Sequence, residues 1–530
     1  MSSILNNDNK AVRTLDLPEM VDAIALHLKS KSAIAAACCV CRAWRVAWTP
    51  VLWRILRLDR KVDAVPASLY LQGSRIKELT LDHPTDDYLA LVLPHCRDLQ
   101  GLSLCCTKAS LSVLSPFLVD LGTRGLRRLE IDTLAIHAAA LVPVLADHCH
   151  SLEILCLQFP FREDRSKLRL QDMLRLLEAC PHLREMELSS VEIRDDPDPD
   201  DPNQEQKLST IQTRLKILVL DSVCLTDTVF LALLERCPML TTISVGYSPA
   251  LTSAAIYPIP ELCPMVENLT LMPTDSLHNS FFATPSFEEL FERTDSPLQL
   301  QHLSLGLGAF DDRMITQVAL SQNSTLRTLD LRDCRNVSDA GIEAVLRHCS
   351  HLESLLLFGT SVTTAIMAGP QERWACFNTL RDLDVRQVGM TDIGFRHPRA
   401  ITNAMSPGNS DAFAAIRRRV QMLPQLRRLA INFSGSIEEL ARGFSLDSGS
   451  QVANGSTAQV IGESGPRLVT LNVRGMEGQA IQGDDMDAFL KNYSFLKRLV
   501  VDQGFFCGGM IRRLHTEGIL YVAGGSCLWH

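Results

Sequence analysis

A short apolar pattern recurs along most of the chain and constrains its fold more than any other feature. The pattern L-x-x-L-x-L, with other aliphatic residues allowed at the Leu positions, begins at fifteen places between Ile76 and Leu496. Most spacings lie between 23 and 34 residues, with two longer gaps. One match is common in a leucine-rich chain, but a near-periodic series indicates an array of structural repeats.

Each copy of the pattern predicts one short strand. In the segment 78–82, Leu79 and Leu81 alternate with polar residues, so both lie on one face of a strand. A single strand of this kind cannot bury its apolar face alone. Neighbouring copies must therefore stack into a parallel sheet with a continuous core.

A helix is predicted after each strand, most clearly in the copy at 326–357. Ser338 and Asp339 favour the start of a helix there. Ile342, Val345 and Leu346 follow at helical spacing, which predicts that they face the core.

A cysteine precedes the strand in several copies, at Cys149, Cys180, Cys237, Cys263 and Cys349. This arrangement resembles the cysteine-containing class of leucine-rich repeats. The resemblance implies an α/β fold over residues 60–530, a curved solenoid of about fifteen repeats with parallel strands on the concave face and helices on the convex face. Because the cysteines stand among apolar positions, we expect small buried residues between helix and strand, without a redox or metal role.

Three stretches lengthen individual repeats, near 194–207, 396–411 and 434–466. The first is acidic and rich in proline, and the third is rich in glycine and serine. Such compositions predict solvated loops. A docking segment is the alternative interpretation.

A different pattern occupies residues 14–59, after an N-terminal segment, 1–13, that we expect to be disordered. It opens with Leu17-Pro18-Glu19-Met20, where proline suits the first turn of a helix. It continues with Val40-Cys41-Arg42-x-Trp44 and closes with Pro50-x-Leu52-Trp53. The order and spacing of these three motifs, over about 45 residues, resemble the F-box. The sequence departs from that family at Ser32-Ala33-Ile34, and its acidic residue, Glu19, falls one place early.

The F-box resemblance implies a three-helix module that binds a Skp adaptor and, through it, a cullin–RING ubiquitin ligase. A unit this small has little core of its own, so exposed apolar residues are expected at a partner site. The alternative is that residues such as Trp44 and Trp53 pack the module onto the first repeat. The predicted adaptor-binding residues are Leu17, Pro18, Met20, Ile24, Leu28, Val40, Cys41, Trp44, Leu52 and Trp53.

The outward positions of the strands predict a second binding surface, for a target protein. In the first six repeats they carry seven acids and one base, and in the last six they carry four acids and five bases. We predict that Leu356 and Phe358 form an apolar anchor ringed by charge, and that the acidic half steers a basic target segment. An ordinary solvated sheet face is the alternative. The residues proposed for this surface are Glu130, Asp132, Glu185, Glu187, Arg332, Leu356, Phe358 and Arg386.

Other functions find little support in the sequence. A net charge of −9 argues against non-specific binding to nucleic acid or anionic membrane, and no apolar run approaches the length that spans a bilayer. No motif for phosphate binding, a catalytic nucleophile or zinc rises above background, so we expect no cofactor, no metal and no catalytic residue. The C-x-x-C at 38–41 lacks a second pair of ligands. Because we find no signal peptide, we expect a cytoplasmic or nuclear protein, in which the many cysteines stay reduced.

Three hypotheses remain open. The first is a substrate receptor of a ubiquitin ligase, and the overall combination resembles fungal F-box/leucine-rich-repeat proteins. The second is a non-ligase interaction scaffold in which the N-terminal helices only cap the array. The third is an enzyme that uses a cysteine such as Cys41, which would need an unusually low thiol pKa.

Overall fold

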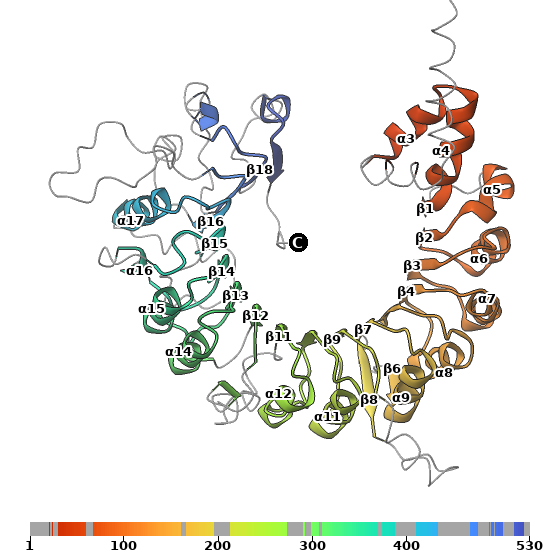
Figure 1. Cartoon of the computed structure of the whole chain (residues 1–530), viewed down its shortest axis with the longest axis horizontal. Helices are drawn as coiled ribbons and strands as arrows, with labels where there is room; N and C mark the ends of the chain where they lie inside the picture. Colours follow the sequence, from red (N-terminus) through yellow and green to blue (C-terminus); the bar gives the residue numbers. More distant parts are fainter. Residues whose placement is uncertain are drawn as a thin grey trace, which may run out of the picture. The chain divides into compact units, whose positions relative to one another are not determined.

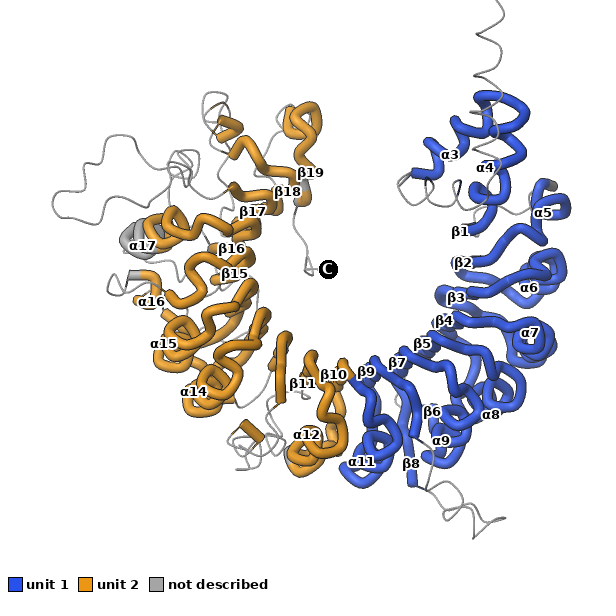
Figure 2. The backbone as a smooth tube through the Cα atoms, viewed as in Figure 1, with its two compact units in different colours: residues 1–240 blue, residues 241–530 orange. Residues whose placement is uncertain are grey.

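The computed structural model of the chain describes residues 21, 24, 30–59, 67–160, 166–195, 212–272, 290–291, 298–306, 310–363, 365–368, 374–386, 410–432, 467–474, 487, 489–491, 493–501 and 513–523. These residues belong to two compact units, 1–240 and 241–530, coloured separately in Figure 2. The predicted disordered segment 1–13 and the predicted insertion 434–466 lie outside the described residues.

Two helices, α3 (Lys31–Cys38) and α4 (Arg42–Arg54), precede the first strand. The Ala33 amide donates to the Ser30 hydroxyl at 3.1 Å to cap α3, and the Trp44 amide donates to the Cys41 Sγ at 3.4 Å to cap α4. Helix α4 leads directly into strand β1 (Ile55–Asp59). Of the first predicted helix, the structure describes Val21 and Ile24, both helical.

Unit 1 is a stack of parallel strands paired in the order β1-β2-β3-β4-β5-β7-β9. The strands after β1 are β2 (Glu78–Asp82), β3 (Gly101–Thr107), β4 (Arg128–Thr133), β5 (Ile154–Gln158), β7 (Glu185–Ser189) and β9 (Ile217–Asp221). The helices are α5 (Ala67–Gln72), η1 (Gly73–Arg75), α6 (Asp86–Val92), η2 (Leu93–His95), α7 (Leu111–Thr123), α8 (Ala138–His148), α9 (Leu170–Ala179) and α11 (Asp227–Arg236). Figure 1 shows the strands of this unit along its inner side and the helices along its outer side.

Unit 2 repeats the arrangement, with consecutive strands paired in parallel from β10 to β19. The strands are β10 (Thr242–Gly246), β11 (Asn268–Met272), β12 (His302–Leu305), β13 (Thr328–Asp330), β14 (Ser354–Leu356), β15 (Asp382–Asp384), β16 (Arg428–Asn432), β17 (Thr470–Arg474), β18 (Arg498–Val501) and β19 (Leu520–Ala523). The helices are η4 (Ser253–Ala255), α12 (Ile259–Leu262), α14 (Asp312–Ser321), α15 (Asp339–His348), α16 (Ala365–Ala368) and α17 (Ser410–Gln421). Helix α17 includes the last two residues of the insertion predicted near 396–411, and residues 396–409 lie outside the described part.

The predicted strand and helix patterns are confirmed. Leu79 and Leu81 are buried on one face of β2, between half-buried or exposed neighbours. Ser338 caps α15, and its apolar positions 342, 345 and 346 are buried. The α/β repeat fold therefore follows from the alternation of apolar residues, since each strand and helix has only one face that can enter the core.

The cysteines of the repeat are also confirmed as buried residues between helix and strand. Cys149, Cys180 and Cys349 each end a helix, at the C-cap of α8, α9 and α15. The Cys180 thiol donates to the Cys149 carbonyl oxygen at 3.3 Å, which joins one repeat to the preceding one. Burial raises the pKa of all three thiols to about 12, so they stay protonated at neutral pH.

A turn that the apolar pattern does not mark follows many of the strands. Residues in the left-handed region stand there, at φ between 51° and 63°, and they are His83, Ser190, Ser222, Tyr247 and Asp333. Cys106, at φ 50°, lies inside β3, where the register with β4 shifts. The His83 amide donates to the Cys105 carbonyl at 2.8 Å, and the Asp333 amide donates to the Phe358 carbonyl at 2.7 Å. Each of these bonds ties the end of a strand to the next repeat, which compensates for the cost of the left-handed conformation.

A second parallel pair, β6 (Ser166–Arg169) with β8 (Val191–Arg194), was not predicted. Its strand β8 ends at the first residue of the insertion predicted at 194–207. From that insertion the structure describes Arg194 and Asp195 only, and the acidic stretch after them lies outside the described residues.

Candidate protein-binding surfaces

The N-terminal helices have a small hydrophobic core of their own. Val21, Ile34, Ala37, Cys38 and Trp48 are buried together in it. Three predicted adaptor-binding residues, Ile24, Trp44 and Leu52, pack against this core and are partly buried. Leu17, Pro18, Met20 and Leu28 lie outside the described residues.

The other predicted adaptor-binding residues differ in exposure. Val40 is 63% exposed, Cys41 is exposed and Trp53 is partly buried. Val46, which the motif comparison did not single out, is 69% exposed on α4. Sequence reasoning could have found it, because Trp44, Trp48 and Val51 share the inward face of α4 and leave Val46 on the opposite one.

The strand face of unit 1 carries most of the predicted acidic residues. The register places Glu130 of β4, Cys156 of β5 and Glu187 of β7 side by side, with Glu185 in the neighbouring row of β7. Desolvation and then the charges of Glu187, Glu130 and Glu185 raise the pKa of the Cys156 thiol to about 12. The carboxylates of Glu130, Glu185 and Glu187 lie near Cys156, and its raised thiol pKa makes it unsuited to act as a nucleophile.

Two of the predicted acidic residues, Glu130 and Asp132, already accept hydrogen bonds from neighbouring residues. Glu130 accepts a hydrogen bond from Arg128 Nε at 2.8 Å. Asp132 accepts from the Cys106 amide at 3.0 Å and from its thiol at 3.1 Å, and so supports the left-handed conformation of Cys106. Asp132 thus has a structural role, whereas Glu185 and Glu187 are better placed to meet a partner.

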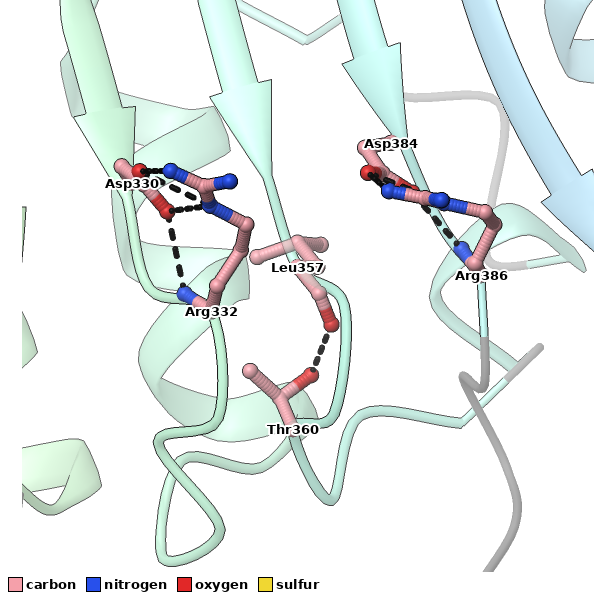
Figure 3. Close-up of polar contacts among 6 residues, drawn as sticks. All are labelled: Asp330, Arg332, Leu357, Thr360, Asp384 and Arg386. Carbon is pink, nitrogen blue, oxygen red and sulfur yellow. Dashed lines mark hydrogen bonds and ion pairs between the residues drawn. The ribbon is translucent and has the colours of Figure 1, made fainter. Parts of the chain in front are cut away.

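In unit 2 two arginine–aspartate pairs flank β14 (Figure 3). Arg332 donates from Nε and Nη2 to the Asp330 carboxylate, at 2.9 and 2.6 Å. Arg386 binds Asp384 through the same two nitrogens, at 2.9 and 2.5 Å, and its backbone amide also donates to Asp384. Each arginine stands two residues after its aspartate, so the same D-x-R spacing builds both pairs.

The apolar anchor predicted between these arginines is only partly exposed. Leu356 and Phe358 are both half-buried. The Arg386 guanidinium lies over the Phe358 ring, 5.0 Å from its centroid, in a cation–π contact. Asp384 has no exposed surface and the Arg386 side chain keeps 11% of its own. The charged pair of Asp384 and Arg386 is therefore largely covered, because the two side chains and Phe358 pack on one another, whereas the Arg332 side chain keeps 29% of its surface exposed.

Metal clusters and membrane-spanning helices can be looked for in the described part of the chain. No group of three or more His, Cys, Asp or Glu side chains there could hold a metal ion. Every helix among the described residues is too short or too polar to cross a membrane.

Comparisons with known proteins agree with the repeat geometry. A family model described as Leucine Rich Repeat matches residues 214–238, which include β9 and α11. No curated protein matches the sequence.

Three solved structures resemble this chain at low sequence identity. A chain of the TLR13–ssRNA13 complex is 13% identical, with a TM-score of 0.42, over 90% of this chain and 52% of that one. This chain thus spans about half the length of that protein. The Rad7–Elc1 complex of yeast gives 15% identity and a TM-score of 0.41 over 74% and 93% of the two chains. A leucine-rich-repeat protein of Leptospira interrogans gives 13% and 0.25 over 89% and 96%.

Proposed function

We propose that this leucine-rich-repeat protein is a substrate receptor of a cullin–RING ubiquitin ligase. In this proposal the N-terminal helices are an F-box that binds a Skp adaptor, and the strand faces of the repeats bind the target protein. The chain contributes no catalytic residue and no cofactor, and acts in the cytoplasm or nucleus. In this proposal the receptor contributes proximity: it holds the target protein close to other subunits, which carry out the catalysis.

The observation that carries the proposal is the exposure of Val40 and Val46 on a helical module that already has its own core. A helical cap that only closed the array would use its apolar residues against the first repeat. Large exposed aliphatic side chains beside a filled core instead suit a partner surface. In the scaffold hypothesis the strands still bind a target protein, but the N-terminal helices bind no adaptor.

A crossed purification experiment tests both halves of the proposal. The tagged chain is isolated from cells, and the adaptor and all other co-purified proteins are quantified by mass spectrometry. Val40→Asp with Val46→Asp should remove the adaptor and keep the target proteins. Leu356→Asp should remove the target proteins and keep the adaptor. Leu356 is changed in place of Phe358 because Phe358 packs on Arg386, so its replacement would also disturb that contact.

Met265→Asp is the matched control, because Met265 is an exposed apolar residue of unit 2 outside both surfaces. It should change neither set of partners. Retention of the adaptor by the Val40/Val46 variant would favour the scaffold hypothesis. If wild-type chain brings down no adaptor at all, the receptor proposal is wrong.

A further inference from the structure

An exposed apolar patch lies on the outer side of unit 1, on the helices α5 and α6 of its first repeats (Figure 1). Tyr70 and Leu71, consecutive residues of α5, are 53% and 79% exposed, and Leu91 of α6 is 44% exposed. The Tyr70 ring packs edge-on against the ring of His95 in η2, with 4.5 Å between the centroids. Leu91 precedes His95 by about one helical turn, which places it beside this contact. We call Tyr70, Leu71 and Leu91 the outer patch.

The core beneath the outer patch is already filled by other residues of the same helices. Leu69 of α5 and Leu89 of α6 are fully buried. A Cβ on Gly73 would clash with the His95 carbonyl oxygen, so η1 and η2 are in direct contact. The outer patch is therefore apolar surface that the fold does not use, and neighbouring exposed apolar residues mark a site of interaction.

A run of cations borders the outer patch, along the edge of the sheet where the strands begin. The chain enters β2, β3, β4 and β5 through the segments 73–77, 93–100, 123–127 and 148–153, all of them described. Backbone hydrogen bonds join these segments in a row, from the Gln100 amide to the Lys77 carbonyl at 2.7 Å and from the Arg127 amide to the Gln100 carbonyl at 2.8 Å. Their cations outnumber their carboxylates, with Arg75, Lys77, Arg97, Arg124 and Arg127 against Asp98 and Glu153.

Two of these cations adjoin the outer patch. Arg75 belongs to η1, which follows α5 directly, and Arg97 stands two residues after His95; both are exposed. Lys77 and Asp98 form an ion pair at 3.5 Å, but their side chains are 36% and 58% exposed, so water weakens the pair and a partner can replace it. Tyrosine and arginine side by side are the residues that dominate the binding energy of many protein interfaces.

The acidic strand face beside this edge favours a protein partner over a nucleic acid. Glu78 and Glu130 stand on β2 and β4, so a partner of uniform negative charge would be repelled next to the cations that attract it. A protein segment can place carboxylates against the cations alone and an apolar side chain against the outer patch. The acidic stretch of this chain at 195–201 has five aspartates but no apolar side chain other than proline.

We propose that the outer patch and the cations beside it bind a segment of a partner protein in which an apolar side chain is flanked by carboxylates. The apolar side chain packs against Tyr70 and Leu71, and the carboxylates pair with Arg75 and Arg97. This surface is separate from the two surfaces of the proposed function and depends on neither of them.

A fluorescein-labelled decapeptide with two leucines between glutamates serves as the probe, and fluorescence anisotropy measures its binding to the full chain. Leu71→Ser should weaken binding about fivefold or more, since it removes an apolar contact at the centre of the surface. Arg75→Glu should weaken it about tenfold or more, since it replaces an attraction by a repulsion. The matched controls Leu320→Ser on α14 and Arg347→Glu on α15 change exposed residues of unit 2 and should each alter binding less than about twofold.

Unchanged melting temperatures of the Leu71 and Arg75 variants would show that their losses come from the surface, because both side chains are exposed. Equal losses in variants and controls, or no measurable binding to the wild-type chain, would overturn the inference.

Two further measurements exclude other occupants. A single-stranded oligonucleotide should bind more weakly than the peptide, and tighter binding would assign the surface to a nucleic acid. Changing the five aspartates of 195–201 to asparagine should leave peptide binding unaltered. A gain of about tenfold would make that stretch the occupant and overturn the assignment to another protein. None of these readouts uses the adaptor, so failure of the receptor proposal would leave them unaffected.

Discussion

Single aspartates fix the spacing between neighbouring helices of the array. Asp312, the first residue of α14, accepts hydrogen bonds from the Ser338 amide at 2.7 Å, the Ser338 hydroxyl and the Gly341 amide at 3.1 Å. Asp86 binds Ser110 in the same way in unit 1. A Cβ on Gly341 would lie 2.7 Å from the Asp312 Oδ1, so the close approach requires glycine there.

We expect Asp312→Ala to lower the free energy of unfolding by about 2–3 kcal/mol. The change leaves three donors of the next repeat without their acceptor, and each such loss costs roughly 1 kcal/mol. Denaturant unfolding followed by circular dichroism measures the difference. Glu343→Ala on α15, which removes only an exposed pair with Arg347, should cost about 0.5 kcal/mol or less. Equal effects of the two changes would rule out a cross-repeat role for Asp312.

At the scale of the strand, the two D-x-R pairs, Asp330–Arg332 and Asp384–Arg386, have the same spacing but differ in how deeply they are buried. The Asp384–Arg386 pair is nearly buried, whereas the Arg332 side chain keeps 29% of its surface exposed. Breaking a buried pair leaves an uncompensated charge, and its cost should exceed that of breaking the more exposed pair.

We therefore expect Asp384→Ala to destabilise unit 2 by about 3–5 kcal/mol. Asp330→Ala should cost about 1–2 kcal/mol, since the Arg332 left behind can reach water. The double variant Asp384→Ala with Arg386→Ala should recover part of the loss, because it leaves no buried charge. A double-mutant cycle by chemical denaturation checks this, and additive losses would contradict the coupling.

The strands and helices were predictable because their apolar residues repeat with the period of the element. Leu79 and Leu81 predict β2, and Ile342 and Val345 predict the inner face of α15. The left-handed residue Cys106 inside β3 has no such signal, since no glycine marks it. The burial of Asp384 also escaped prediction, because alternation tells which face a residue occupies and does not tell what its neighbours cover.

The candidate sites were predictable only in part. The motif around Val40 identified the N-terminal module and one exposed aliphatic residue of its surface. Val46 could have been found from the helical spacing of Trp44, Trp48 and Val51, which leaves it on the opposite face of α4. Some partners of charged side chains lie in a neighbouring repeat, as Asp132 does for Cys106, 26 residues earlier, and the strand pattern alone does not reveal such contacts.

For the whole molecule, the strand face of each unit has its own charge. In unit 1 the face carries Glu130, Glu185 and Glu187 around Cys156, whereas in unit 2 Asp330, Asp382 and Asp384 are each paired with an arginine. Surfaces of one sign raise the rate at which an opposite partner associates, and salt screens this effect over a Debye length of about 8 Å at physiological ionic strength.

We expect Glu185→Lys with Glu187→Lys to slow association of a Lys-rich decapeptide about tenfold at low salt, with a smaller effect on its dissociation. Stopped-flow fluorescence at several salt concentrations measures both rates, and the difference from wild type should shrink as salt rises because screening removes the attraction. Asp87→Lys with Glu178→Lys makes the same change of net charge on exposed helix residues of unit 1 and should slow association far less. If the helix variant slowed it equally, the net charge of the chain, and not the strand face, would govern the encounter.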